Sequence, residues 1–330
     1  MNKDGKTLFR YAKNVFSSEK YIVITTGCTV YLMDRDYQIL QSYKKLDHIC
    51  YVEISPNEKY LLMASVINLF YVVDIDSQSM EKAWIDIPYD YNLEGAARFS
   101  TDSGHIYAIC TNSKSLQSCF RVYEVGDLTS YRDYIAEKYC IFAIDIDRTG
   151  NDGAILVGLD RKTDRFYLLR YDNRGMQEYR LPLYYDDIPM SVFHHAKDHL
   201  VMIFGQSCLL LCDEQGDAYV EINNFGLTTH DEPKTCRIDD SFRGHLFALL
   251  QKLEGENETL RYFSVPRNIA FGDRQNRLYF RGKYGLYYFD LGDDSLVKIS
   301  ETGFFKNVEE IDENSIVLTL DSGSCLVVLS

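Results

Sequence analysis

The chain has 330 residues, of which 46% are hydrophobic, and its formal net charge is −14 at pH 7. An acidic surface repels phosphate backbones and anionic lipids, so the charge argues against nucleic-acid-binding and membrane-adsorbing proteins. The chain holds 26 Tyr and 18 Phe but only six Pro and one Trp, a composition that favours strands. We therefore expect a β-rich protein that has neither nucleic acid nor a membrane among its partners.

The N-terminus and the cysteines indicate where the protein resides. Residues 1–6 are polar, and no apolar run of the length needed for a signal sequence or a membrane span follows them. The nine cysteines stand mostly within apolar runs, as buried thiols of a reducing compartment do. No Cys-x-x-Cys pair occurs. We expect a soluble, cytoplasmic protein with no metal and no cofactor.

A strand-turn-strand-turn-strand pattern recurs along the chain and is clearest from Val52 to Asp74. In each unit an apolar residue precedes a polar turn, and these residues are Phe16, Ile54, Phe99, Ile146, Phe193, Ile238, Phe271 and Ile311. Their mean spacing of about 41 residues lies within the range of a four-stranded propeller blade. We therefore predict an all-β protein, a single β-propeller domain over residues 1–330 with eight blades of mostly four antiparallel strands.

The strand ends carry further signals. Five of the predicted third strands end at an Asp that we expect to accept backbone N–H bonds from the next turn: Asp34, Asp74, Asp172, Asp213 and Asp290. The last repeat ends after its third strand, while Thr7–Tyr11 has no blade of its own. We expect this N-terminal strand to complete the last blade and close the ring.

One repeat is irregular. The step from Ile238 to Phe271 spans 33 residues. It holds a predicted second strand at Leu246–Leu250 and a third at Leu260–Val265, but Pro266 leaves no room for a fourth. Either this blade has three strands or it merges with its neighbour, so seven blades are the alternative.

The segment from Ser55 to Val66, S-P-N-E-K-Y-L-L-M-A-S-V, followed by Phe70–Asp74, resembles the WD40-type propeller repeat. Weaker copies begin at Val15 and Phe99. No Trp-Asp pair occurs, and the dipeptide Gly104-His105 stands in a turn instead of opening a unit. The resemblance therefore implies a WD40-like propeller without the His–Asp network of typical WD40 blades, and it leaves the function open.

Three motifs have plain structural interpretations. Asp145–Gly153 looks like a calcium loop, but Thr149 replaces the expected third carboxylate, so we expect a polar turn. Ser100-x-Asp102-x-Gly104 is similar to the Asp-box of sialidase propellers, yet it lies between a first and a second strand, so we assign it no role. Three His side chains crowd one turn, and we interpret them as surface or strand-end residues: His194, His195 and His199.

The connections that lead into the first strands are the best candidates for a site. Two of them, Asp86–Glu94 and Leu183–Pro189, are rich in both Tyr and carboxylates, and His230–Glu232 adds further acid. Tyr is enriched at interfaces, and carboxylates steer a basic partner. The candidate partner-binding residues are Tyr89, Asp90, Tyr91, Tyr184, Tyr185, Asp186, Asp187, Asp231 and Glu232.

The sequence contains no G-x-S-x-G, P-loop or G-x-G-x-x-G motif. We therefore expect a non-enzymatic, WD40-like interaction scaffold that binds a basic or polar segment of another protein, as a monomer or within a hetero-complex. The alternative is a propeller hydrolase of the lactonase or glycosidase kind, with a metal or carboxylates at the central channel. Glu94, Asp145 and Asp187 lie near such positions.

Overall fold

The protein is represented by a computed structural model. It describes residues 6–65, 69–84, 97–111, 115, 117–136, 138–149, 152–172, 174–181, 189, 191–196, 199–205, 208–216, 219–223, 226–229, 244–245, 248–249, 251–253, 269–272, 276–282, 285–300, 307–320 and 323–328. The chain forms two compact units. The N-terminal unit comprises Tyr11–Glu178, and the C-terminal unit comprises Met1–Arg10 together with Tyr179–Ser330.

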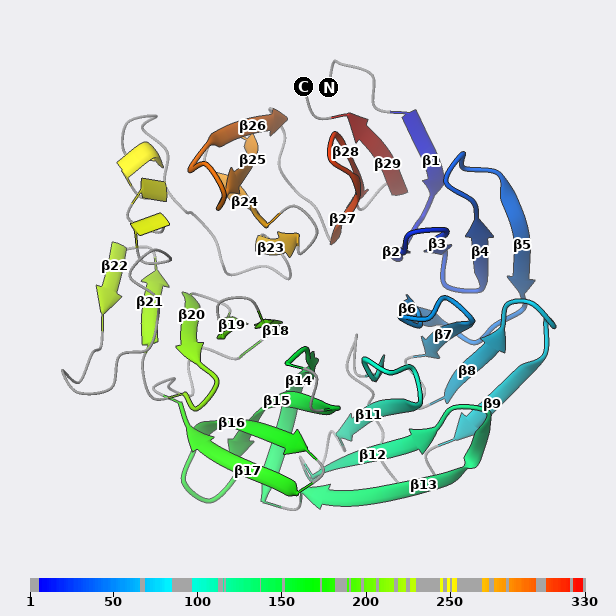
Figure 1. Ribbon diagram of the computed structural model, residues 1–330, viewed down its shortest axis with the longest axis horizontal. Helices are drawn as coiled ribbons and strands as arrows, with labels where there is room; N and C mark the ends of the chain where they lie inside the picture. Colours follow the sequence, from blue (N-terminus) through cyan, green and yellow to red (C-terminus); the bar gives the residue numbers. More distant parts are fainter. Residues whose placement is uncertain are drawn as a thin grey trace. The chain divides into compact units, whose positions relative to one another are not determined.

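Four antiparallel sheets, each of four consecutive strands, make up the described part of the N-terminal unit (Figure 1). The first consists of β2 (Asn14–Ser17), β3 (Ile22–Thr25), β4 (Thr29–Met33) and β5 (Ile39–Lys44). The second consists of β6 (Ile49–Ile54), β7 (Tyr60–Ser65), β8 (Leu69–Asp74) and β9 (Met80–Trp84). The third consists of β10 (Ala97–Phe99), β11 (His105–Thr111), β12 (Ser118–Glu124) and β13 (Asp127–Ala136). The fourth consists of β14 (Tyr139–Asp147), β15 (Gly153–Asp160), β16 (Arg165–Asp172) and β17 (Gly175–Arg180).

Three sheets make up the described part of the C-terminal unit. One has five strands, β18 (Ser191–His195), β19 (Leu200–Phe204), β20 (Cys208–Asp213), β21 (Tyr219–Asn223) and β22 (Gly226–Thr229). The next has β23 (Ile269–Gly272), β24 (Arg277–Gly282), β25 (Gly285–Asp290) and β26 (Leu296–Ser300). The last joins β27 (Asn307–Asp312), β28 (Ser315–Leu320) and β29 (Gly323–Val328) to β1 (Lys6–Arg10).

The N-terminal strand completes the last sheet, as predicted. β1 pairs antiparallel with β29, with Lys6 opposite Leu326 and Arg10 opposite Gly323. A strand from the start of the chain therefore covers an edge that the C-terminal repeat leaves unpaired.

The prediction of eight blades is wrong. The described residues form six four-stranded sheets and one five-stranded sheet, and the predicted unit between Ile238 and Val265 contributes none of them. Within the predicted strand Leu246–Leu250, the described residues Ala248 and Leu249 are helical. Helical residues continue to Leu253.

The apolar spacing explains this helical segment. The sequence has the i, i+3, i+4, i+7 pattern of one helix face at Leu246, Leu249, Leu250 and Leu253. The strand prediction did not take this pattern into account. Leu249 and Leu253 are buried in a cluster with side chains of the β18–β22 and β23–β26 sheets. Described residues of the predicted eighth blade are thus helical and belong to none of the sheets. Within the parts of the chain that the structure describes, no helix has the length and apolarity that crossing a membrane requires.

Apolar side chains pack neighbouring sheets of the N-terminal unit against each other. Leu32 and Met63 belong to a cluster shared by the first and second sheets, and Phe70 and Phe99 to one shared by the second and third. A further cluster joins the third and fourth sheets. Every residue of β15 is buried, as expected for a second strand that is covered on both faces.

The turns form as their sequences predict. All five Asp residues that end a third strand accept a backbone N–H bond from the following turn through Oδ1: Asp34, Asp74, Asp172, Asp213 and Asp290. Ser55 donates to Asn57 at 2.7 Å and accepts the N–H of Tyr60 at 2.9 Å. Glu58 in this turn has φ of 58°. These local bonds explain why the polar segment folds back between two strands.

A chain of buried ion pairs crosses the first strands of three sheets. The Arg98 guanidinium on β10 lies 3.3 Å from Glu53 of β6 and 2.9 Å from Asp145 of β14. Arg148 contacts Asp145 from the other side at 3.2 Å. Burial raises the pKa of Glu53, and the neighbouring Arg98 opposes that rise. Arg98 therefore compensates carboxylates that would otherwise be costly to bury.

Replacing Arg98 by Met should destabilise the protein strongly. The substitution leaves Glu53 and Asp145 buried without this cation, and such a loss costs about 3–5 kcal/mol. Chemical denaturation measures the free energy of unfolding. The matched control is Arg174→Met, which removes an exposed guanidinium paired with Asp172 and should cost no more than about 1 kcal/mol. Equal effects of the two substitutions would contradict the role given to Arg98.

Candidate functional site

All nine residues predicted to bind a partner lie outside the described residues. Their role therefore stays a prediction. Glu94 and Asp187, named for the hydrolase alternative, also lie outside. Asp145, the third residue named for it, is fully buried and bridged by Arg98 and Arg148. Two guanidinium groups thus occupy the Asp145 carboxylate.

One end of the sheets in the N-terminal unit forms a continuous edge. In an antiparallel meander, the turns between strands one and two and between strands three and four lie at the same end. We call this the turn end. Its neighbouring turns contact each other, since Lys20 pairs with Glu58 at 3.0 Å and the Asn57 N–H donates to Ser103 at 3.0 Å.

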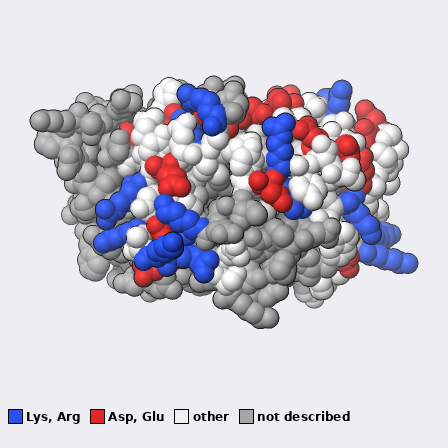
Figure 2. All heavy atoms as spheres, turned by 90° about the horizontal axis from the view of Figure 1, so that it is seen from below, with Lys and Arg blue, Asp and Glu red and all other residues white. Residues whose placement is uncertain are grey.

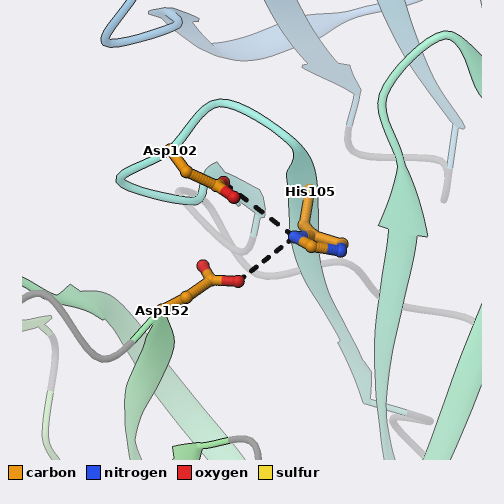
Figure 3. A group of neighbouring side chains, drawn as sticks. All are labelled: Asp102, His105 and Asp152. Atoms are coloured by element: carbon orange, nitrogen blue, oxygen red, sulfur yellow. Dashed lines mark ion pairs between the residues drawn. The ribbon is translucent and has the colours of Figure 1, made fainter.

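The turn end carries a group that we call the carboxylate cluster: Asp102, His105, Glu124 and Asp152. Asp102 and His105 come from the turn and start of β11, and Asp152 from the turn before β15 (Figure 3). Nδ1 of His105 lies 3.3 Å from Asp152 and 3.9 Å from Asp102. Its Nε2 faces Glu124, the last residue of β12, at 3.5 Å. Carboxylates from two sheets thus surround one imidazole.

Neighbouring hydroxyl groups hold the carboxylates in place. The Ser100 hydroxyl donates to Asp102 at 2.6 Å and the Gly104 N–H at 2.8 Å, and these bonds lower the pKa of Asp102. Asp152 accepts a bond from the Tyr107 hydroxyl at 2.8 Å. Burial, then Asp152 itself, raises the pKa of Tyr107, so this hydroxyl stays a donor. The ionised form of Asp102 is thereby favoured, and the Tyr107 hydroxyl holds the Asp152 carboxylate in place.

The carboxylate cluster differs from other acidic groups of the unit in its charge balance. Asp147 pairs with Arg170 at 2.6 Å and Glu58 with Lys20 at 3.0 Å. Among the residues that the structure describes, no Lys or Arg pairs with Asp102, Glu124 or Asp152. The cluster therefore keeps a local negative charge that attracts a cation.

Two kinds of cation suit this geometry. Asp102 is exposed and Glu124 and Asp152 are half-exposed, so an ammonium or guanidinium group can reach them. The ligand atoms of Asp102, His105 and Asp152 also lie within 4.8 Å of one another, as in a site for a divalent ion. Nδ1 of His105 is buried and has no hydrogen-bond partner in the described residues. The cluster thus has the charge and the donor atoms that a cation requires.

The sequence does not show that the residues of the carboxylate cluster lie together, and no role was predicted for them. Ser100, Asp102 and Gly104 were interpreted as an Asp-box coincidence, and Asp152 as part of a loop of calcium type. The signal that could have joined them is the presence of acidic first turns in two consecutive repeats. Asp102 and Asp152 are 50 positions apart in the sequence.

The described carboxylates between Asp145 and Gly153 face different partners. Asp145 pairs with Arg98, Asp147 with Arg170, and Asp152 with His105.

In the C-terminal unit, Glu214 joins His194 and His199, each at 3.1 Å. His194 is fully buried, which agrees with a strand-end role.

Comparison with known proteins shows the fold alone. No family model matches the chain, and no curated protein matches it. Among solved structures it is similar to the β-propeller domain of Cps50 (Swd1) from Myceliophteria thermophila, a WD40-type propeller, with 12% identity, complete coverage of both chains and a TM-score of 0.65. It is also similar to hydrazine synthase of Kuenenia stuttgartiensis, with 11% identity over 97% of this chain and 96% of that chain and a TM-score of 0.64. The chain therefore has a β-propeller fold, as predicted.

Asp102→Asn should lower the free energy of unfolding at pH 7, since it removes a carboxylate that Ser100 and Gly104 stabilise in its ionised form. The folded pKa of Asp102 lies below the usual 3.8, so its contribution is present above about pH 3.8 and is lost as the pH falls through the folded value. Chemical denaturation at several pH values should show that the difference in unfolding free energy between Asp102→Asn and wild type becomes smaller as the pH falls from 5 to 2.5. The exposed Asp36→Asn at the same end is the control, and a pH-independent difference for Asp102→Asn would contradict the assignment.

Proposed function

We propose that this propeller is a non-catalytic protein-interaction scaffold that captures a basic segment of a partner protein. The carboxylate cluster provides the anchor at the turn end of the N-terminal unit. One observation carries the proposal: ionised carboxylates from two sheets converge on His105 without a compensating Lys or Arg among the described residues.

The surroundings of the cluster favour the same partner. Further carboxylates are exposed at the turn end, among them Glu19, Asp36, Asp76 and Asp127. Lys20, Lys59 and Arg174 are also exposed at this end, so the attraction of a basic segment depends on the carboxylates that no Lys or Arg faces. Each contact with an exposed carboxylate contributes little, so affinity would come from several Lys or Arg residues that bind together.

The hydrolase alternative has no specific support in the described residues. In the N-terminal unit, the acidic side chains of the first strands are paired with guanidinium groups, since Glu53 and Asp145 share Arg98, and Asp147 binds Arg170. The similar structures include a protein that is an enzyme by its name and a WD40-type propeller, so the fold does not decide between the classes.

The connections rich in Tyr and carboxylates remain a separate part of the proposal. Strands β9 and β17 end, and β10 begins, at the end of their sheets opposite the turn end. Tyr89, Tyr91, Tyr184 and Tyr185 would therefore serve a second contact region instead of extending the first. An experiment therefore has to distinguish peptide binding at the turn end from peptide binding at these connections.

The test uses a fluorescein-labelled hexalysine peptide and fluorescence anisotropy at low salt. The variant Asp102→Asn/Glu124→Gln/Asp152→Asn should bind the peptide at least about tenfold more weakly, because three exposed charge contacts are removed. The matched control is Asp47→Asn/Asp164→Asn/Glu178→Gln, which removes the same charge from exposed positions away from the turn end. Its affinity should fall by less than about threefold.

Three results would contradict the anchor at the turn end. The first is that wild type does not bind the peptide, and the second is that both triple variants lose the same affinity. The third is that affinity falls only in the variant Tyr89→Ser/Tyr91→Ser/Tyr184→Ser/Tyr185→Ser. The last result would assign capture to the predicted connections. Melting temperatures of all variants establish that each one is folded.

A further inference from the structure

We propose that Asp102, His105 and Asp152 bind a divalent metal ion of the zinc type. All three residues belong to the N-terminal unit and to the carboxylate cluster. The inference concerns the free protein, so it does not depend on the capture of a basic segment. Two observations carry it. Ligand atoms of two chemical kinds lie close together, and one imidazole nitrogen among them is buried without a hydrogen bond.

The distances between the ligand atoms fit a zinc ion. Figure 3 shows that both carboxylates are directed at the imidazole of His105. Its Nδ1 is 3.3 Å from Oδ2 of Asp152 and 3.9 Å from Oδ1 of Asp102. Two ligands of a tetrahedral zinc ion are about 3.3–3.6 Å apart, since each lies about 2.0–2.2 Å from the metal. One pair already has this separation, and the exposed Asp102 needs only a small movement to reach it.

Nδ1 of His105 has the properties of a metal ligand. It is buried, and it has no hydrogen-bond partner among the described residues. Asp152 lies 3.3 Å from it, yet the two atoms are not aligned as donor and acceptor. Atoms that surround an ion point at the ion instead of at each other. A buried nitrogen without a hydrogen bond is costly, and an ion between the three side chains would satisfy it.

Neighbouring groups orient two of the ligands, as they do around metal ions in other proteins. Nε2 of His105 faces Glu124 at 3.5 Å, and a carboxylate beside the second nitrogen fixes the orientation of a metal-binding imidazole. The Tyr107 hydroxyl donates to Oδ1 of Asp152 at 2.8 Å, which leaves Oδ2 for an ion. A nitrogen ligand and an oxygen ligand are therefore held in place before an ion binds.

The charge around the three side chains also suits an ion. On the face that Figure 2 shows, Lys and Arg side chains stand among the Asp and Glu side chains. In contrast, no Lys or Arg of the described residues pairs with Asp102, Glu124 or Asp152. Gly150 and Asn151, which precede Asp152 and lie outside the described residues, bear no charge. A divalent ion would supply the cation that these carboxylates lack within the described part of the chain.

The donor atoms favour zinc and similar transition metals over calcium and magnesium. Calcium takes about six to eight oxygen ligands, and magnesium prefers an octahedron of oxygen ligands that includes several waters. One imidazole nitrogen with two carboxylates suits zinc, which binds nitrogen and oxygen donors in a tetrahedron. Three protein ligands leave the fourth position for water. Zn²⁺ is therefore the probe for this site.

The experiment is isothermal titration calorimetry of the full chain with zinc chloride, after EDTA treatment and gel filtration. His105→Gln should weaken zinc binding at least about 100-fold because it removes a ligand, while Glu124→Gln disturbs only an orienting partner and should weaken it about tenfold. The matched control, His48→Gln, removes an exposed imidazole elsewhere in the N-terminal unit and should leave the affinity unchanged. Melting temperatures establish that every variant is folded.

Absorption spectra of the Co²⁺-loaded protein identify the kind of ligand, since thiolates add intense near-ultraviolet bands that nitrogen and oxygen ligands do not. The inference would be overturned if wild type bound no zinc, or if His105→Gln bound zinc as tightly as wild type. Thiolate bands in the cobalt spectrum would also overturn it and would assign the ion to cysteines. A bound ion and a Lys side chain would compete for the same carboxylates. Hexalysine binding is therefore measured in EDTA, so that this inference and the proposed function fail separately.

Discussion

The guanidinium of Arg98 sets the geometry on which the N-terminal unit depends. Apolar contacts hold its sheets face to face, but they are not directional and permit small rotations. Arg98 fixes the sheets by contacting Glu53 on one side at 3.3 Å and Asp145 on the other at 2.9 Å. The Glu53 carboxylate also accepts the N–H of Phe99 at 3.1 Å, directly before the turn that carries Asp102. The position of the first strands thereby determines which turns meet at the turn end.

Local sequence signals predicted the repeating part of this fold well. The segment Val52–Asp74 contains the end of β6, then β7 and β8, and Ser55 and Asn57 form the predicted turn between β6 and β7 because hydrogen bonds within a few residues determine that turn. The Asp residues at the ends of third strands acted as expected for the same reason. The N-terminal strand could also be placed, since the last repeat lacked an outer strand that only Thr7–Tyr11 could supply.

Sequence reasoning failed where structure depends on distant residues. The apolar run at Leu246–Leu250 is compatible with both a strand and a helix, and the repeat pattern was given more weight than the spacing of Leu249 and Leu253. The carboxylate cluster was missed because Asp102 and Asp152 belong to different repeats and meet only when two sheets stack. No motif within one repeat could reveal that contact.

Net charge is a poor guide to the partners of this chain because the charge is distributed unevenly along its sheets. The value of −14 argued against nucleic-acid and membrane partners, and the carboxylates of the Tyr-rich connections suggested a basic partner. In the β14–β17 sheet, however, Asp152 lies at one end and Lys138, Arg161 and Lys162 at the other. Antiparallel strands place the turns of a sheet alternately at its two ends, so substitutions in alternate turns change the charge of one end without changing the other. The turns of a propeller can in this way change in charge while its buried strands stay the same.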